Sequence, residues 1–270
     1  MVPHSNSFRN RCAVSVITVV FNGVKNIEGT ILSVLNQSYR NVEYLVVDGG
    51  STDGTLDVIR KYEDKIDRLV SEPDKGIYDA MNKGIGLATG EWINFMNCGD
   101  RFASRDVLEM FNGNFNGADL VYGDAIQEYP TFQTKFKKFP LTSMWREMPF
   151  CHQAAFVKAS LMKEYKFDLH YRLSADYDFI YRAYVANKKF VYVDKLVCLF
   201  DFKGGASKSY AFDSIDERRH SSLKHRYSVW KRLYYFFYRP YVKIKIFFKK
   251  KVGDKATAWI TRLLRTQQVK

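Results

Sequence analysis

The strongest constraint in this sequence is an alternation of apolar, strand-like runs with helix-like segments over the first 125 residues. Residues 14–20 (VSVITVV) are rich in β-branched side chains, and the turn pair Asn22-Gly23 follows them. Apolar residues then recur at helical spacing over residues 27–35. The first pattern is typical of a buried strand and the second of a helix packed on it. Repeated units of this kind predict an α/β protein with a mostly parallel central sheet.

The same pattern predicts four more strands before residue 125. They are expected at residues 43–47, 66–70, 91–96 and 119–122. Helices are expected between them, through Leu56 and Ile59, over residues 78–88 and over residues 107–111. The sequence therefore predicts a Rossmann-like first half in which each strand is followed by a helical segment.

After residue 125 the alternation weakens. Residues 131–139 are expected to form an edge strand or a flap, and residues 176–186 a helix. Short strands are expected at residues 151–157, 191–193 and 196–200. This part is therefore predicted to extend the sheet with less regular connections.

Acidic side chains gather where the predicted strands end. In open α/β sheets ligands bind outside the carboxyl ends of the strands, and that rule selects Asp48, residues 72–75, residues 97–100 and Asp124. The sequence has neither a G-x-G-x-x-G dinucleotide fingerprint nor a P-loop. A divalent cation on a diphosphate needs only one or two carboxylates, so Asp100 suits Mg²⁺ or Mn²⁺.

Several separated blocks of the chain resemble one family. The segments VSVITVVFNGVKNIEGTILSVLNQSYRNVEYLVVDGGSTDGT and SEPDKGIYDAMNKGIGLATGEWINFMNCGD resemble family 2 glycosyltransferases with a GT-A fold. FCHQAAFV and LSADYDFIYRAY are similar to the acceptor half of that family. The resemblance is close over about residues 13–110 and looser over 119–200. It implies transfer of a sugar from a nucleotide-diphosphate donor, most often a UDP-sugar, with inversion at the anomeric carbon.

The resemblance also assigns residues to the nucleotide. It places Thr18 and Asn22 beside the base pocket, and Asp48 at the position that reads uracil. Asp74 and Lys75 match the loop that closes over the base. The remaining nucleotide-binding residue that it implies is Asn97.

The metal motif of the family usually reads Asp-x-Asp-Asp or Asn-x-Asp-Asp, whereas this chain reads Asn97-Cys98-Gly99-Asp100. Only the last carboxylate is present. We therefore expect Asp100 to hold Mn²⁺ or Mg²⁺ together with the diphosphate.

In the second half, Asp176 matches the catalytic base of the family. Inversion needs a carboxylate opposite the leaving diphosphate and within hydrogen-bond reach of the acceptor hydroxyl. Asp178 is a weaker candidate for that side of the site, because two residues further along a helix it points elsewhere. His152 is expected on the acceptor side, with a structural role as the alternative. The Q-x-x-R-W motif of processive members is absent, which favours addition of a single sugar.

The basic charge of the chain is concentrated at its C-terminal end. Residues 221–270 hold 14 of the 42 Lys and Arg residues, one acid (Asp254) and 11 aromatic residues, so the other 220 residues are neutral overall. Basic and aromatic residues together are typical of a segment that lies on an anionic bilayer. The alternatives are a helical pair packed on the body and, with no nucleic-acid motif in support, a nucleic-acid-binding tail. No apolar run approaches about 18 residues, so no spanning helix is expected.

These observations predict a GT-A domain over residues 1–220, with a nucleotide half at about 13–124 and an acceptor half at about 125–220. A basic helical extension would follow at 221–270. The predicted protein is a metal-dependent hexosyl or N-acetylhexosaminyl transferase that builds a surface polysaccharide such as an O-antigen or capsule. Its partners would be a nucleotide sugar, a saccharide acceptor on a lipid carrier and the inner face of the cytoplasmic membrane. The alternative is a catalytically degenerate domain that only binds a nucleotide sugar.

Overall fold

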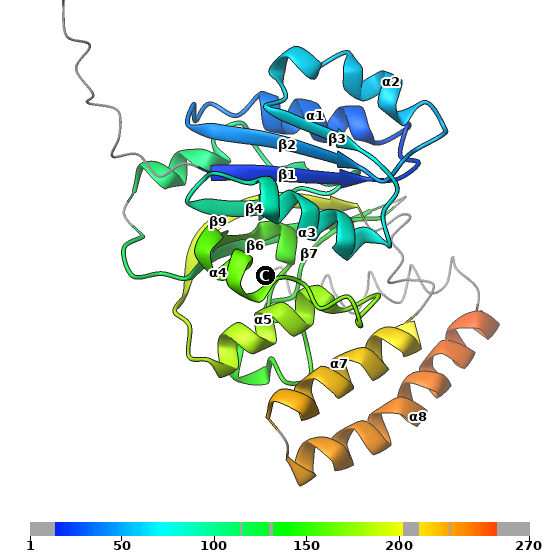
Figure 1. The fold of residues 1–270 in the computed structure, drawn as a ribbon. Coiled ribbons are helices and arrows are strands. Elements are labelled where there is room, and N and C mark those ends of the chain that lie inside the picture. The colour runs from blue at the N-terminus through cyan, green and yellow to red at the C-terminus, as the bar shows by residue number, and fades with distance from the viewer. Residues whose placement is uncertain (1–13, 114, 130–131, 202–210, 227, 253–270) are drawn as a thin grey trace, which may run out of the picture.

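The computed structural model describes residues 14–113, 115–129, 132–201, 211–226 and 228–252. Within them, nine strands form one curved sheet with helices on both faces (Figure 1). The strand order is β3-β2-β1-β4-β8-β6-β9-β5, and β7 pairs with β6. The strands are β1 (Val14–Val20), β2 (Val42–Asp48), β3 (Arg68–Ser71), β4 (Trp92–Phe95), β5 (Arg101–Phe102), β6 (Leu120–Glu128), β7 (Gln133–Lys135), β8 (Ala155–Lys158) and β9 (Phe190–Asp201).

The first half confirms the predicted parallel arrangement. β1 pairs in parallel with β2 and with β4, and β2 pairs in parallel with β3. The connecting helices are α1 (Ile27–Leu35), α2 (Thr55–Arg60) and α3 (Ile77–Leu87). Neighbouring residues of a strand face opposite sides, so Val16 packs with Ile27 and Ile59 while Ile17 packs with Met81. Two apolar cores therefore sandwich the sheet, and all four strands end at the same edge.

The second half mixes strand directions and departs from the predicted elements at several points. β8 lies antiparallel between β4 and β6, while β9 runs parallel to β6 and antiparallel to the short β5, which the sequence did not predict. The two strands expected at 191–193 and 196–200 are one bulged strand, β9. The expected helix at 107–111 is the 3₁₀ helix η2 (Val107–Asn112).

The strand expected at 151–157 also begins late. Its first residues form the 3₁₀ turn η4 (His152–Ala154), which places His152 in a turn before β8. The other elements of this half are η1 (Glu63–Lys65), η3 (Leu141–Ser143), α4 (Ala159–Tyr165) and α5 (Ala175–Val185). The polar opening of residues 151–154 favours a turn, because its side chains bond to neighbouring segments instead of alternating across a sheet.

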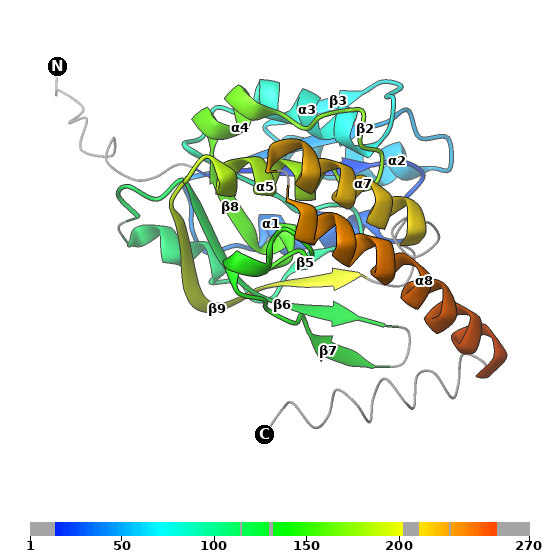
Figure 2. The same ribbon diagram turned by 90° about the horizontal axis from the view of Figure 1, so that it is seen from below.

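The C-terminal segment forms two antiparallel helices against the body, α7 (Ala211–His225) and α8 (Val229–Val252) (Figure 2). Lys231 Nζ donates to Tyr181 Oη at 2.7 Å, and Tyr235 Oη donates to the carbonyl of Trp145 at 2.7 Å. The boundary expected after residue 220 falls inside α7. Residues 253–270 of the predicted basic helical extension lie outside the described residues. No helix in the described part of the chain is both long and apolar enough to cross a membrane.

Asp178 fastens α7 to α5. Its buried carboxylate accepts hydrogen bonds from Arg182 Nε (2.8 Å), Ser221 Oγ (2.7 Å) and His225 Nε2 (3.0 Å). Three donors and full burial make this a structural anion. The expectation that Asp178 serves the acceptor site finds no support in this geometry, because its carboxylate faces α7.

Two glycines of α3 give opposite predictions for the free energy of unfolding. A Cβ on Gly84 would lie 2.6 Å from Ile17 Cγ2, so Gly84→Ala should destabilise the fold by about 1–3 kcal/mol through overpacking. A Cβ on Gly86 would meet nothing within 4 Å, so Gly86→Ala should stabilise by about 0.5–1 kcal/mol. Urea unfolding of both variants checks the pair. Equal effects would contradict the packing of α3 on β1.

Removing the Asp178 carboxylate should be far more damaging than removing an exposed one. Asp178→Ala leaves Arg182 and His225 partly buried without their partner, with an expected cost of about 3–5 kcal/mol. Asp57→Ala is the control, because that side chain is 81% exposed and its change should stay within about 0.5 kcal/mol. Urea unfolding measures both. Similar costs would mean that α7 is not held through Asp178.

Candidate active site

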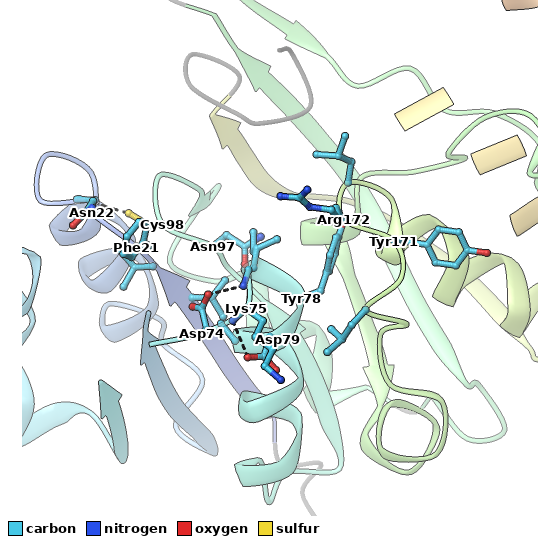
Figure 3. Close-up of a pocket in the computed structure, with 18 of the residues that line it drawn as sticks. Phe21, Asn22, Asp74, Lys75, Tyr78, Asp79, Asn97, Cys98, Tyr171 and Arg172 are labelled. Atoms are coloured by element: carbon cyan, nitrogen blue, oxygen red, sulfur yellow. Dashed lines mark hydrogen bonds between the residues drawn. The ribbon is translucent and has the colours of Figure 1, made fainter. Parts of the chain in front are cut away.

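A cleft of about 810 Å³ opens at the edge where the parallel strands end. Its walls come from the loop after β1, the turn after β4, the first turn of α3, the loop 169–173 and α7. Figure 3 shows Phe21, Asn22 and Cys98 on one side, Asp74 and Lys75 below, and Arg172 opposite. Segments from both halves of the chain and from its C-terminal extension therefore share one cavity.

Four of the predicted nucleotide residues line this cleft: Asn22, Asp74, Lys75 and Asn97. Asn22 has a positive φ of 50°, and its Oδ1 accepts from the backbone N–H of Thr52 at 2.9 Å. A Cβ on Gly49 would lie 2.3 Å from Asp74 Oδ2. Only glycine lets Asp74 approach the loop after β2 so closely, so three strand-end loops are packed into one rim.

Two predicted nucleotide residues lie beneath the cleft and do not line it. Thr18 is fully buried, and its Oγ1 donates to the carbonyl of Met96 at 2.8 Å. Asp48 is also fully buried, and its carboxylate accepts from Ser71 Oγ at 2.6 Å and from the backbone N–H of Ser51 at 3.1 Å. Thr18 therefore links β1 to the end of β4, and a nucleobase could reach the fully buried Asp48 only if the residues that cover it moved.

Asp100 lies in the floor beside the cleft, with little exposure. Its Oδ2 accepts from Gln153 Nε2 at 2.9 Å, and its Oδ1 accepts from the backbone N–H of Asp201 at 2.9 Å. Burial raises the pKa of Asp100 to about 7, although these two hydrogen bonds act to lower it. Its role as the metal ligand stays a prediction. Among the described residues, no three His, Cys, Asp or Glu side chains converge on one point that could hold a metal.

Asp176 is held between His152 and Tyr78 beside the cleft, and Asp176 and His152 line a small adjoining cavity. His152 Nδ1 lies 3.1 Å from Asp176 Oδ2, and Tyr78 Oη donates to Asp176 Oδ1 at 2.9 Å. The His152 and Asp176 side chains keep 23% and 19% of their surface exposed. Tyr78 itself lines the cleft, and His152 Nε2 lies 3.4 Å from the Asn97 amide nitrogen. Two of the three predicted second-half residues are thus brought together next to the predicted nucleotide residues.

The protonation of this pair follows from its contacts. Burial alone would raise the pKa of Asp176, but the hydrogen bond and charge of His152 outweigh it and leave that pKa below its ordinary value. Burial likewise would lower the pKa of His152, but Asp176 raises it to about 9. Asp176 is therefore an ionised carboxylate at neutral pH, the form that a proton acceptor needs.

Several residues of the cleft were not predicted as site residues. Phe21 follows β1 and is 63% exposed, and Arg172 brings a cation to the opposite wall. Glu217 of α7 accepts from the backbone N–H groups of Arg172 and Leu173, both at 2.9 Å. The sequence does contain a signal for Phe21, because this aromatic residue directly follows a strand that is predicted to be buried. The role of Glu217 depends on a contact across 45 positions, which the sequence gives no means to foresee.

Comparison with known proteins agrees with this geometry. The sequence profile described as "Glycosyl transferase family 2" matches residues 15–166. A PGL/p-HBAD biosynthesis glycosyltransferase of Mycobacterium bovis is 33% identical over 204 residues, which cover 72% of this chain and 79% of that protein. The putative teichuronic acid biosynthesis glycosyltransferase TuaG of Bacillus subtilis is 40% identical over 100 residues, 36% of this chain and 39% of that one.

Solved structures share the fold at low sequence identity. The mannosyltransferase PcManGT from Pyrobaculum calidifontis, in complex with GDP-Man and Mn²⁺, superimposes with a TM-score of 0.67 at 17% identity. That match covers 94% of this chain and 81% of the other. S. aureus TarS 1-349 in complex with UDP-GlcNAc gives a TM-score of 0.63 at 20% identity, and 79% of this chain spans 66% of it.

The profile match covers more than half of the chain, and the cleft lies at the edge where the parallel strands of a GT-A sheet end. This protein belongs to glycosyl transferase family 2 and has the GT-A fold.

Proposed function

We propose that this protein is an inverting glycosyltransferase that moves one sugar from a nucleotide diphosphate to a saccharide acceptor on a lipid carrier. The transferred group would be a hexosyl or N-acetylhexosaminyl unit, and the product a surface polysaccharide such as an O-antigen or capsule. The polysaccharide role is supported by the relative named for teichuronic acid biosynthesis. Residues 13–124 would bind the donor and residues 125–220 would receive the acceptor.

One observation carries the chemistry: an ionised Asp176 held by His152 and Tyr78 next to the cleft. Two partners fix the carboxylate in position, so little reorganisation is needed when the acceptor arrives. Asp176 would accept the proton of the attacking hydroxyl while the sugar passes through an oxocarbenium-like transition state. His152 would orient Asp176 and favour its ionised form.

The leaving diphosphate would be met by cations and amide groups. Lys75 and Arg172 bring positive charge to the cleft, which Asn97 also lines (Figure 3). A bound Mn²⁺ or Mg²⁺ would neutralise the departing diphosphate, which then needs no acid catalyst. The turn formed by residues 97–100 is the part of the chain that would hold this ion. The Mn²⁺ bound to PcManGT supports a divalent cation here.

A UDP-sugar is the donor that we propose. It is supported by the match of Asp48 to the uracil-reading position and by the UDP-GlcNAc complex of TarS. Asn22, Asp74 and Lys75 form the exposed rim on which the nucleotide would lie. Asp48 would take part once the residues that cover it move. Thr18 is left out of the site, because its hydroxyl is committed to the backbone beneath the cleft.

The outer face of α8 supports docking on an anionic membrane. Trp230, Phe236 and Phe237 are 80%, 69% and 67% exposed on this helix, and Leu233 and Tyr241 are also exposed. The segment from residue 221 onward accounts for the net positive charge of the chain. The inner face of α8 packs on α7, which lines the cleft. A bilayer against the outer face of α8 would therefore lie close to the acceptor half. This arrangement suits an acceptor carried on a lipid at the inner face of the cytoplasmic membrane.

The second candidate is a domain that binds a nucleotide sugar without turnover. The departure at Asn97-Cys98-Gly99-Asp100 favours it, because the third residue lacks a carboxylate. The intact Asp176 cluster favours the enzyme, since a pure binding domain has no use for a positioned, ionised base. The two candidates differ in one measurable property, which is transfer itself.

Replacing the proposed base should separate binding from chemistry. Asp176→Asn should keep nucleotide binding within about twofold and lower the transfer rate by about a hundredfold or more, in line with the loss of a general base. Binding is measured as thermal stabilisation by UDP, GDP, CMP and dTDP with Mn²⁺, where a ligand at a hundred times its Kd adds about 2.7 kcal/mol. Transfer is measured with the matching nucleotide sugars.

Glu164→Gln is the control for that experiment, because it removes an exposed carboxylate from α4. It should leave both binding and transfer unchanged. Full transfer by Asp176→Asn would overturn the base assignment. Nucleotide binding by the unaltered protein with no transfer of any sugar would favour the binding-domain candidate.

If the outer face of α8 docks on a membrane, removing its aromatic side chains should weaken binding to vesicles. Replacing Trp230, Phe236 and Phe237 together by Ala should lower binding to vesicles that contain phosphatidylglycerol by about tenfold or more, since each side chain would lose apolar contact. Vesicle sedimentation measures the effect. Phe21→Ala removes an aromatic side chain of similar exposure outside α8 and should leave vesicle binding unchanged. Equal binding to neutral phosphatidylcholine vesicles would contradict an electrostatic contribution.

A further inference from the structure

The turn after β4 has no side chain at its third position. Gly99 has φ +99°, a backbone conformation that favours glycine. A Cβ built on Gly99 would lie 3.3 Å from Asp201 Oδ2 and 3.4 Å from Asp201 Cβ. The space where a side chain of residue 99 would begin is therefore bordered by the carboxylate of Asp201, which arrives from the end of β9.

The end of β9 is tied to this turn at two levels. The backbone N–H of Asp201 donates to Asp100 Oδ1 at 2.9 Å. Two and three residues before Asp201, β9 pairs with β5, the short strand that directly follows Asp100. Leu199 lies opposite Arg101, and Cys198 lies opposite Phe102. Strand pairing and the buried acceptor together hold the backbone of Asp201 beside the turn.

The same turn carries a polar atom that lacks a partner. Asn97 is more than nine-tenths buried and lines the cleft, and its Oδ1 makes no hydrogen bond within the described part of the chain. Buried side-chain oxygens are rarely left unsatisfied in native structures, so such an atom points to a missing ligand. An amide oxygen and a carboxylate oxygen are both ligand types of Mg²⁺ and Mn²⁺.

We propose that Asp201 supplies the carboxylate that this motif lacks at Gly99, and that it binds the diphosphate-associated divalent cation together with Asn97 Oδ1. In this arrangement Asp100 accepts the hydrogen bond that holds the Asp201 backbone, and it does not have to bind the ion alone. The inference rests on the proposed function, because the cation would arrive with a nucleoside diphosphate. Waters and diphosphate oxygens complete its coordination, as is usual for Mg²⁺ at phosphate sites.

The test measures Mn²⁺ affinity in the presence of nucleotide, with no turnover required. Calorimetric titration of Mn²⁺ into protein saturated with UDP, and in parallel with GDP, is compared for the unaltered chain, Asp201→Asn and Asp100→Asn. Asp201→Asn keeps the shape of the side chain and should weaken Mn²⁺ binding by about tenfold or more. Metal-free binding of the nucleotide should change by less than about twofold, because the carboxylate acts through the ion.

Asp194→Asn is the matched control, since it removes an exposed carboxylate from the same strand. It should leave Mn²⁺ affinity unchanged. If Asp201→Asn does not fold, Asp201→Glu keeps the charge and should retain measurable Mn²⁺ binding, whereas Asp201→Ala should lose it. Unchanged Mn²⁺ affinity in Asp201→Asn, or a loss confined to Asp100→Asn, would overturn the inference. If the unaltered protein bound no nucleotide at all, the proposed function would fail instead.

Discussion

Three segments that are far apart in the sequence meet at the buried carboxylate of Asp100. Gln153 donates to it from the turn before β8, and the backbone of Asp201 donates to it from the end of β9. A buried polar group is costly unless its atoms are hydrogen-bonded, so the Asp100 carboxyl group holds the three segments together through these bonds. These bonds fix the position of the β4 turn, which borders the cleft, relative to the second half of the sheet.

The contacts of Asp176, the proposed base, depend on this arrangement around Asp100. Gln153 is the neighbour of His152 in η4, so anchoring Gln153 to Asp100 also fixes the backbone from which His152 reaches Asp176. On the other side, Tyr78 comes from the first turn of α3, the helix that Gly84 allows to pack closely on β1. A carboxylate on α5 is thus positioned by residues from two different parts of the chain. Such positioning by rigid elements is what a proton-transfer site requires.

The sequence predicted the parallel half well because its signals are local. Strands β1, β2 and β4 and helices α1 and α3 lie where apolar periodicity placed them, within a residue or two. The pairing of His152 with Asp176 could not be derived from spacing, since it joins positions on separate elements. Thr18 and Asp178 show the converse limit: each has a suitable side chain near a functional motif, yet each is bonded to its own scaffold. Burial decides between these outcomes, and burial depends on tertiary contacts.

The C-terminal extension combines the two interpretations that its composition left open. The side of α8 that carries Lys231, Tyr234 and Tyr235 packs on the body, and the side that carries Trp230, Phe236 and Phe237 remains exposed. A helix apolar on two sides needs two apolar surroundings, and the part of the body that the structure describes supplies one of them. Because α7 both lines the cleft through Glu217 and packs on α8, whatever covers the outer face of α8 lies one helix away from the site. Helix α7 is therefore better understood as a wall of the candidate site than as part of an appended tail.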